Sequence, residues 1–188
     1  MLTRARDTDL SAITELMNVA FRGTGPAASW NTEADIIDGN RTNEALLRAE
    51  LAEKPQATLL VWRANPTGSV HGCVLLEPAA DKTWYLGSLT VDPRLQKSGF
   101  GRRVLAAAEQ WASEHGANTM RLTVVNVRNT LIAWYQRRGY RLTGEMQPFP
   151  YADHRFGTPR RDDLAFIVLE KPLRERNPCS PTSLSSSI

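Results

Sequence analysis

The sequence contains few of the residues that build disulfide frameworks and metal sites. Its 188 residues include two cysteines and three histidines, which are too widely separated to match a metal-ligand spacing. Cys73 lies in an apolar stretch and Cys179 in a polar one, so the sequence does not predict a disulfide between them. We therefore expect no metal site and a protein that works in a reducing, cytoplasmic compartment.

Long apolar runs are also missing. No stretch of about eighteen consecutive apolar residues is present, and no apolar segment follows Arg4 and Arg6, which argues against a membrane span and a secretion signal. The formal net charge is only +3, and the arginine pairs at 102–103, 137–138 and 160–161 are dispersed. Nucleic-acid binding would need a denser basic stripe with aromatic residues between the charges, so we do not expect it. Dispersed arginines are typical of a solvated surface that attracts anionic ligands.

The composition of the chain is that of an ordinary globular protein. Hydrophobic residues make up 41% of the sequence and charged residues 23%, values typical of one domain of this length. From about residue 177 onward Pro, Ser and Thr replace the hydrophobic spacing. We expect a single domain over residues 1–173, followed by a disordered tail over 174–188.

Apolar periodicity predicts about seven strands and about four helices. Alternation and β-branched content predict strands at 2–6, 57–64, 70–77, 83–91, 119–125, 140–146 and 164–169. Helical spacing predicts helices after a cap at Asp7 or Thr8, at 43–53, from Gly101 to Gly116, and after a cap at Asn129 or Thr130. The fourth to sixth of these elements in the chain are strands joined by short turns, which favours an antiparallel run.

The most informative stretch is Ser88–Ala112. Its strand is stopped by Asp92-Pro93, because proline cannot donate a hydrogen bond to a sheet, and the loop Arg94–Phe100 leads into an amphipathic helix. The first turn of such a helix has N–H groups without internal partners and the positive end of a helix dipole. Gly99 and Gly101 have no Cβ to hold a ligand away from it. This order of strand, basic glycine loop and helix predicts a phosphate cradle.

The glycine spacing excludes two common nucleotide loops and matches a third pattern. Neither the three-glycine dinucleotide fingerprint nor the Gly-Lys-Ser/Thr phosphate loop is present. Instead, Gln96-x-x-Gly99-x-Gly101 resembles the pyrophosphate-binding signature of the GNAT superfamily of acyl-CoA N-acyltransferases. A strand ending in Val91-Asp-Pro precedes the motif, and Trp134-Tyr135 with Gly139-Tyr140 follows about one strand and one helix later, which agrees with that family. The resemblance covers roughly residues 2–173.

This resemblance implies an α/β, three-layer fold with a mixed central sheet, and acetyl-CoA as the cofactor. In that family the strand before the cofactor loop and the strand after its helix are parallel neighbours that separate at their C-terminal ends. The pantetheine arm of coenzyme A lies between them, paired with main-chain groups, and the loop holds the pyrophosphate. The implied cofactor-binding residues are Leu89, Thr90, Val91, Gln96, Lys97, Ser98, Gly99, Phe100, Gly101, Arg102, Arg103 and Asn129.

Acyl transfer to an amine needs a proton for the departing thiolate, a donor for the oxyanion and a deprotonated amine. The resemblance assigns the proton to Tyr135, for which packing against the sheet is the alternative role, and the oxyanion donor to a backbone N–H near Val91. The strand at 83–91 departs from better understood members because it contains no carboxylate. Glu33, Glu77 and Glu145 are candidate bases, and loss of the amine proton to ordered water is the alternative.

Acceptor selectivity in that family usually comes from the loop between the first two helices and from a late loop. Here these segments supply Trp30, Glu33 and Arg41, and Phe149, Tyr151 and His154. An aromatic cavity with a carboxylate would suit a cation-bearing or amphipathic amine, whereas Arg41 could equally hold a carboxylate. The sequence leaves both open.

The function that these observations predict is transfer of an acetyl group from acetyl-CoA to a primary amine of a small molecule or peptide. An acyltransferase that acts on a hydroxyl or uses a longer acyl chain is one alternative. A CoA-binding sensor or partner-binding module without turnover is another, because the strand carboxylate is missing. Dimerisation is common in the family, and no sequence feature decides whether this chain forms a homodimer.

Overall fold

The structure is a computed structural model. It describes residues 1–26, 28–65, 67–96, 98–153, 155 and 157–173. The predictions for Lys97, His154 and Cys179, and for the tail at 174–188, lie outside the described residues.

A seven-stranded sheet forms the centre of the domain, in the order β1-β3-β4-β5-β6-β9-β7. Its strands are β1 (Leu2–Arg4), β3 (Thr58–Trp62), β4 (Gly72–Pro78), β5 (Thr83–Val91), β6 (Thr119–Val125), β7 (Arg141–Pro148) and β9 (Ala165–Pro172). β5 and β6 are parallel, and the other neighbouring pairs are antiparallel. The predicted mixed sheet is confirmed, as is the antiparallel run of β3, β4 and β5.

Four α-helices accompany the sheet: α1 (Leu10–Arg22), α2 (Glu44–Glu53), α3 (Phe100–Glu114) and α4 (Asn129–Gln136). The predicted cap of α1 is wrong, because a 3-10 helix at Asp7–Asp9 precedes it and the Asp9 carboxylate accepts the backbone N–H of Arg6. The predicted cap of α4 is also wrong, since Arg128 holds the N-cap position.

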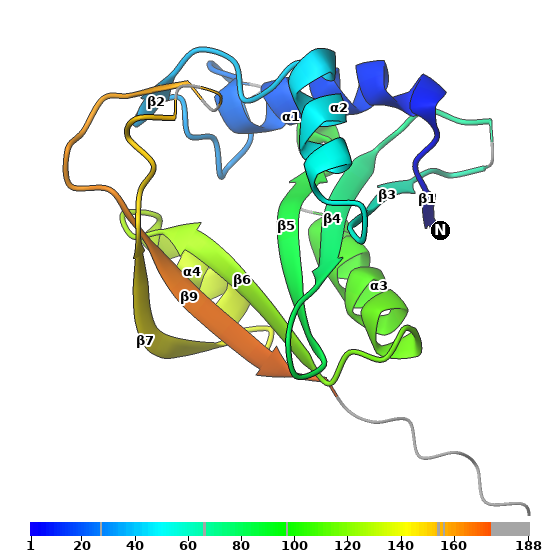
Figure 1. Ribbon diagram of the computed structural model, residues 1–188. Helices are drawn as coiled ribbons and strands as arrows, with labels where there is room; N and C mark the ends of the chain where they lie inside the picture. Colours follow the sequence, from blue (N-terminus) through cyan, green and yellow to red (C-terminus); the bar gives the residue numbers. More distant parts are fainter. Residues whose placement is uncertain (27, 66, 97, 154, 156, 174–188) are drawn as a thin grey trace, which may run out of the picture.

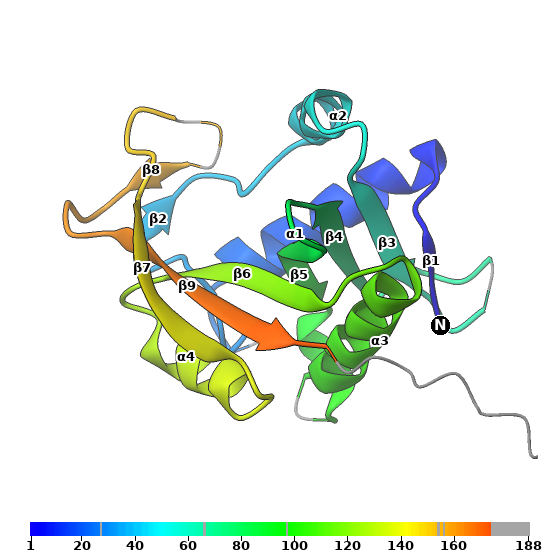
Figure 2. The same ribbon diagram turned by 60° about the horizontal axis from the view of Figure 1, so that its bottom comes forward.

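Alternating strand residues divide the core into two layers. On one face of the sheet Leu59, Val61, Cys73 and Leu75 pack with α1 and α2 residues. On the other face the intervening strand residues pack with α3 and α4, in a cluster that includes Leu60, Val74, Leu76, Leu105, Ala108, Ile132 and Tyr135. Figure 2 shows the resulting order, with α1 and α2 on one side of the sheet and α3 and α4 on the other. Period-two strands and 3.6-period helices dictate this three-layer arrangement.

The two parallel strands separate soon after they begin. Their paired residues are Thr83 with Thr119, Trp84 with Met120, and Tyr85 with Arg121, all at the N-terminal ends. Figure 1 shows β5 and β6 diverging from there toward their arrowheads. The predicted separation of these strands is confirmed, and it exposes main-chain groups of both strands to the space between them.

A second, two-stranded sheet joins β2 (Ile37–Asp38) to β8 (Thr158–Pro159). The sequence analysis did not predict it, because each strand has two residues and no pattern can be read from so short a segment. It connects the segment between α1 and α2 to the loop that follows β7, the two regions expected to choose the acceptor.

Candidate active site

A cavity of about 770 Å³ occupies the opening between β5 and β6. Its walls also include the start of α3, one side of α4 and part of the segment between α1 and α2. The predicted cofactor-binding residues that line it are Leu89, Thr90, Val91, Gln96, Gly99, Phe100, Gly101 and Arg102. The predicted catalytic and substrate residues that line it are Tyr135, Trp30, Glu33, Arg41 and Phe149. The fold thus gathers most of the candidate residues around one space.

Three predicted cofactor-binding residues do not line this cavity. Ser98 is exposed, and its hydroxyl donates to the Leu95 carbonyl oxygen at 2.7 Å. The Arg103 guanidinium lies over the ring of Phe100, 5.2 Å from the centroid. Asn129 is exposed at the first position of α4.

Two predicted substrate residues and one candidate base also lie elsewhere. A Glu77 carboxylate oxygen is 3.0 Å from the ammonium of Lys54, outside the cavity lining. The Tyr151 hydroxyl accepts the backbone N–H of Leu164 at 2.6 Å, so it holds a loop together. Glu145 is exposed on β7 and pairs with an arginine of β6.

β5 carries a bulge at the centre of the cavity wall. Cys73 pairs with Thr90 and Leu75 with Gly87, so the single residue between them on β4 faces both Ser88 and Leu89. Ser88 has φ of +50°, which is unusual for a residue other than glycine. Such a bulge turns main-chain groups out of the ladder. The backbone N–H near Val91, to which the resemblance assigns the oxyanion, lies beyond this bulge, because Val91 itself pairs with Gly72 of β4.

The start of α3 provides an open main-chain surface. Gly99 occupies the N-cap position with φ of +75°, a left-handed conformation that glycine adopts without strain. A Cβ on Gly101 would lie 3.5 Å from the Trp134 ring and 3.8 Å from Val91. The absence of a side chain there keeps a passage open between α3, β5 and α4.

Positive side chains gather beside this helix start. Arg102, Arg137 and Arg138 all line the cavity. The Arg138 guanidinium stacks on Trp134, 3.6 Å from the ring centroid, and donates to the Trp134 carbonyl at 2.5 Å. Its Nε is buried, and no described residue accepts a hydrogen bond from it. Burial, together with the neighbouring Arg137 and Arg102, lowers the pKa of Arg138.

Gln96, the first residue of the motif, holds a second segment against the cavity. Its side-chain amide donates to the Ser29 hydroxyl at 2.7 Å and accepts the backbone N–H of Trp30 at 3.1 Å. The Trp30 ring in turn lies 6.3 Å from that of Trp134. Gln96 therefore positions an aromatic wall, in addition to whatever it contributes to a bound phosphate.

Tyr135 is buried at the cavity wall. Its ring meets the rings of Trp134 and Tyr140 edge-on, at 4.9 and 5.4 Å. Burial, reinforced by Tyr85, raises the pKa of Tyr135 well above its usual value, so its hydroxyl carries a proton at neutral pH. The Tyr85 hydroxyl shares a hydrogen bond of 2.8 Å with Thr123, which ties β5 to β6 where their main chains no longer pair.

The other end of the cavity is built around Glu33. Its carboxylate accepts a hydrogen bond of 2.7 Å from Arg22, and the two side chains are 15% and 8% exposed. Arg41 lies over the Phe21 ring, 5.5 Å from its centroid. Burial lowers the pKa of Arg41, although Glu33 and Glu50 oppose that shift.

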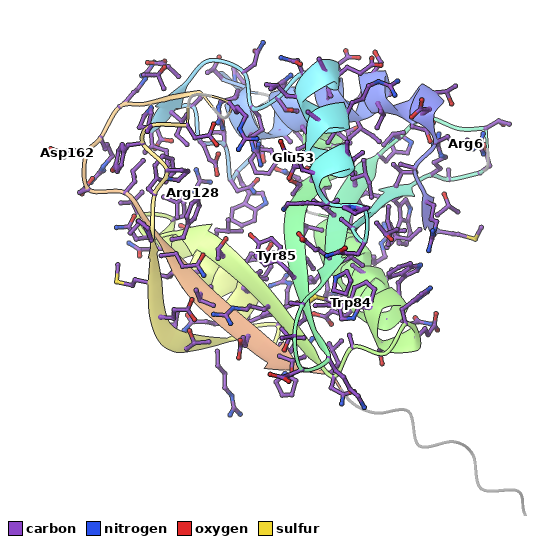
Figure 3. The ribbon with its side chains drawn as sticks, viewed as in Figure 1. Arg6, Glu53, Trp84, Tyr85, Arg128 and Asp162 are labelled. Atoms are coloured by element: carbon purple, nitrogen blue, oxygen red, sulfur yellow. The ribbon has the colours of Figure 1, made fainter. Side chains whose placement is uncertain are left out.

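Arg128 completes this end of the cavity from the segment that joins β6 to α4. Its guanidinium donates to the backbone carbonyl of Thr32. Burial lowers the pKa of Arg128, and Glu33 and Asp35 partly offset that effect. Figure 3 labels Arg128 beyond the end of β6 and Tyr85 on β5, on opposite sides of the space between the two strands.

Sequence reasoning did not single out Arg22, Tyr85, Arg128, Arg137 or Arg138, all of which line the cavity. For Arg137 and Arg138 the sequence predicts a solvated surface that attracts anionic ligands, because a charged pair after an amphipathic helix gives no sign of facing inward. The position of Arg128 immediately before α4 is the one signal available, since loops at the C-terminal ends of parallel strands commonly carry function.

Among the described residues, no group of three His, Cys, Asp or Glu side chains could hold a metal ion. None of the helices that these residues form is long and apolar enough to span a membrane.

A mixed sheet that opens between two parallel strands, with a glycine-capped helix at one end of the opening, is the arrangement that the sequence resemblance implies. The chain belongs to the acetyltransferase (GNAT) family, whose family model matches residues 11–140. The resemblance stated from the motif is thereby confirmed.

Individual relatives agree with this membership. The uncharacterized N-acetyltransferase YhfO of Bacillus subtilis (strain 168) is 26% identical over 144 residues, which cover 74% of this chain and 88% of YhfO. The ribosomal-protein-alanine N-acetyltransferase of Brucella melitensis superposes with a TM-score of 0.65 at 19% identity, over 92% of this chain and 99% of its own. A GNAT family acetyltransferase of Elizabethkingia anophelis with acetyl-CoA bound gives 0.53 at 16% identity, over 67% and 83%. The two structural likenesses show the fold.

Proposed function

We propose that the protein transfers an acetyl group from acetyl-CoA to a primary amine of a small molecule or peptide by direct transfer. The observation that carries the proposal is that Tyr135, the β5 bulge and the start of α3 face one cavity. Family membership supports acetyl transfer. The choice of a primary amine rests on the sequence resemblance and on the cavity chemistry below.

The residues at the α3 end of the cavity fit coenzyme A. The buried Nε of Arg138 has no hydrogen-bond acceptor among the described residues, and a phosphate oxygen would supply one. The space beside Gly101, which a side chain would narrow, lets a diphosphate approach the helix N–H groups. When bound, acetyl-CoA supplies the acetyl group as a thioester and departs as a thiol.

Two groups of the chain can assist the transfer. Main-chain N–H groups at the Ser88–Leu89 bulge can donate to the acetyl oxygen as it gains charge. Tyr135 Oη delivers its proton to the departing sulfur as the C–S bond breaks and the amine nitrogen bonds to the acetyl carbon, and the resulting tyrosinate regains a proton from water. The raised pKa of Tyr135 keeps that proton in place until it is needed.

The amine loses its own proton to water in this account. The two carboxylates that line the cavity, Glu33 and Glu50, lie 2.7 Å from Arg22 and 3.9 Å from Lys54. Either carboxylate would have to give up that contact to accept a proton from the amine. An amine of modest pKa that is already partly neutral needs neither of them.

Release of free thiol from acetyl-CoA, measured across a panel of primary amines and matched alcohols, tests the proposal. We expect release with amines and an acetylated product identified by mass spectrometry. Faster release with alcohols would indicate transfer to a hydroxyl, and faster release with longer acyl-CoA donors would indicate transfer of a longer acyl chain. Binding of CoA without release for any acceptor would make the protein a sensor.

A further inference from the structure

The end of the cavity away from α3 has an excess of positive charge. Four cationic side chains line it among the described residues, Arg22, Arg41, Lys54 and Arg128, against the two carboxylates of Glu33 and Glu50. An enclosed space of this kind attracts an anion, because the charges are less screened there than in water.

Arg22 and Lys54 pair with carboxylates of the protein. Arg22 donates to Glu33 at 2.7 Å, and Lys54 lies 3.0 Å from Glu77. Arg128 differs from both, because the hydrogen bond that it makes goes to the Thr32 carbonyl, a neutral group. No described residue brings a carboxylate within ion-pair distance of Arg128. Glu33 and Asp35 act on Arg128 only from beyond ion-pair distance, so its charge is more open to a ligand than the charges of Arg22 and Lys54.

The position of Arg128 along α4 separates this charge from the phosphate end. Arg128 precedes the helix and Arg138 follows it, so about 12 Å of helix rise lies between them. Tyr135 lies in the last turn, on the cavity side. Cations thus stand at both ends of α4, with the proton donor between them. One end faces the glycine-capped helix start, and the other faces the segment between α1 and α2.

We infer that the acceptor is an amine that also carries a carboxylate, as an amino acid does, and that Arg128 binds this carboxylate. The planar guanidinium can bind both carboxylate oxygens, which orients the molecule as well as holding it. Arg41 adds positive charge on the same side of the cavity. This inference rests on the proposed function and names its substrate class.

The alternative is a cation-bearing acceptor held by Glu33. The contact of Glu33 with Arg22 weighs against it, because a second cation would have to share a carboxylate that already has a partner. Burial of that cation beside Arg41 and Arg128 would also add repulsion. The charge balance of the cavity favours the anion.

Matched acceptors test the inference. Initial rates of thiol release would be compared for phenylalanine, phenylalaninamide and phenethylamine, and for methionine and methioninamide, with acetyl-CoA saturating. We expect kcat/KM to be at least about tenfold higher for the carboxylates. Equal or higher values for the carboxylate-free amines would overturn the inference and leave the proposed acetyl transfer intact. If none of these amines is acetylated, both the inference and the proposed function are overturned.

Variants then separate binding from folding. Arg128→Gln should raise KM for the carboxylate acceptor about 10- to 100-fold and lower the preference for phenylalanine over phenethylamine by a similar factor. Arg128→Lys keeps the positive charge but lacks the planar guanidinium with its paired N–H donors, so it should recover part of the lost affinity for the carboxylate acceptor. It also provides a test if Arg128→Gln does not fold. Arg161→Gln is the matched control, since Arg161 is exposed and pairs with Asp163. An unchanged KM in both Arg128 variants would overturn the assignment.

Discussion

The guanidinium of Arg138 lies 3.6 Å from the centroid of the Trp134 ring and is anchored by the Trp134 carbonyl. This stack presents a partly buried cation to the cavity beside the start of α3. Burial disfavours the charged form of this side chain and lowers the pKa of Arg138. A bound phosphate would stabilise the charged form.

Arg138→Gln should weaken the binding of coenzyme A. A hydrogen bond to a charged group contributes about 1.5–3 kcal/mol, which corresponds to a Kd roughly 10- to 100-fold higher. Titration calorimetry with CoA at two salt concentrations measures this, and the variant should show the smaller salt dependence. An unchanged Kd would mean that Arg138 serves only to brace Trp134.

Gly101→Leu should abolish CoA binding without unfolding the protein. The Cβ finds only ordinary contacts at 3.5 and 3.8 Å, so the fold tolerates it, but the longer side chain blocks approach to the helix N–H groups. Thermal melting and calorimetry together check both halves. Ala106→Leu, on the exposed face of α3, is the control and should bind CoA normally. Unchanged CoA affinity in Gly101→Leu would contradict the proposal that the N–H groups at the start of α3 bind the diphosphate.

Tyr135→Phe should lower kcat by about 10²–10⁴ while leaving the Kd for CoA nearly unchanged, because the hydroxyl acts only in the transfer step. Tyr140→Phe is a suitable comparison, since Tyr140 donates to Glu109 at 3.0 Å and does not line the cavity. The comparison variant should lose stability but keep its kcat. If Tyr135→Phe has the same kcat as the unmodified protein, Tyr135 only packs against the sheet and does not donate the proton.

The pH profile gives an independent check of the same residue. Burial raises the pKa of Tyr135, and the proton-donating form exists below that pKa. Turnover should therefore not fall through loss of the Tyr135 proton until the pH exceeds about 10, the usual value for tyrosine. A decline near neutral pH that disappears in Tyr135→Phe would contradict the assignment.

The ion pair between Asp9 and Arg63 should make stability depend on pH. Burial alone would raise the pKa of Asp9, but the Arg6 N–H and the Arg63 guanidinium outweigh it and hold the pKa below the usual value. The stabilisation is therefore present at neutral pH and is lost as the pH falls through the folded-state pKa, below about 4.

Asp9→Asn should consequently reduce the free energy of unfolding by about 3 kcal/mol at pH 7, because Arg63 is left buried without its partner. Urea unfolding at pH 7 and pH 3 measures the difference, which should shrink at the lower pH. Asp163→Asn removes an exposed pair and should change stability little at either pH. A difference that stays constant with pH would contradict this reading of Asp9.

The fold could be predicted from the sequence where local signals were strong. β5 and β6 have the predicted bounds, because Pro93 closely follows the end of β5 and a turn immediately precedes the start of β6 at Thr119. The bulge at Ser88 could not be located, because a positive φ at a residue other than glycine leaves no mark in the sequence. The gathering of Arg128 and Arg138 at the cavity depends on how α4 packs, which charge patterns do not encode.

A crystal structure of the protein with acetyl-CoA is the most direct test of the account. We predict the diphosphate at the N–H groups that begin α3, beside Gly101 and within hydrogen-bond distance of Arg138, and the thioester between the Ser88–Leu89 bulge and the Tyr135 hydroxyl. Acetyl-CoA bound outside the opening between β5 and β6, or with its thioester away from Tyr135, would contradict it.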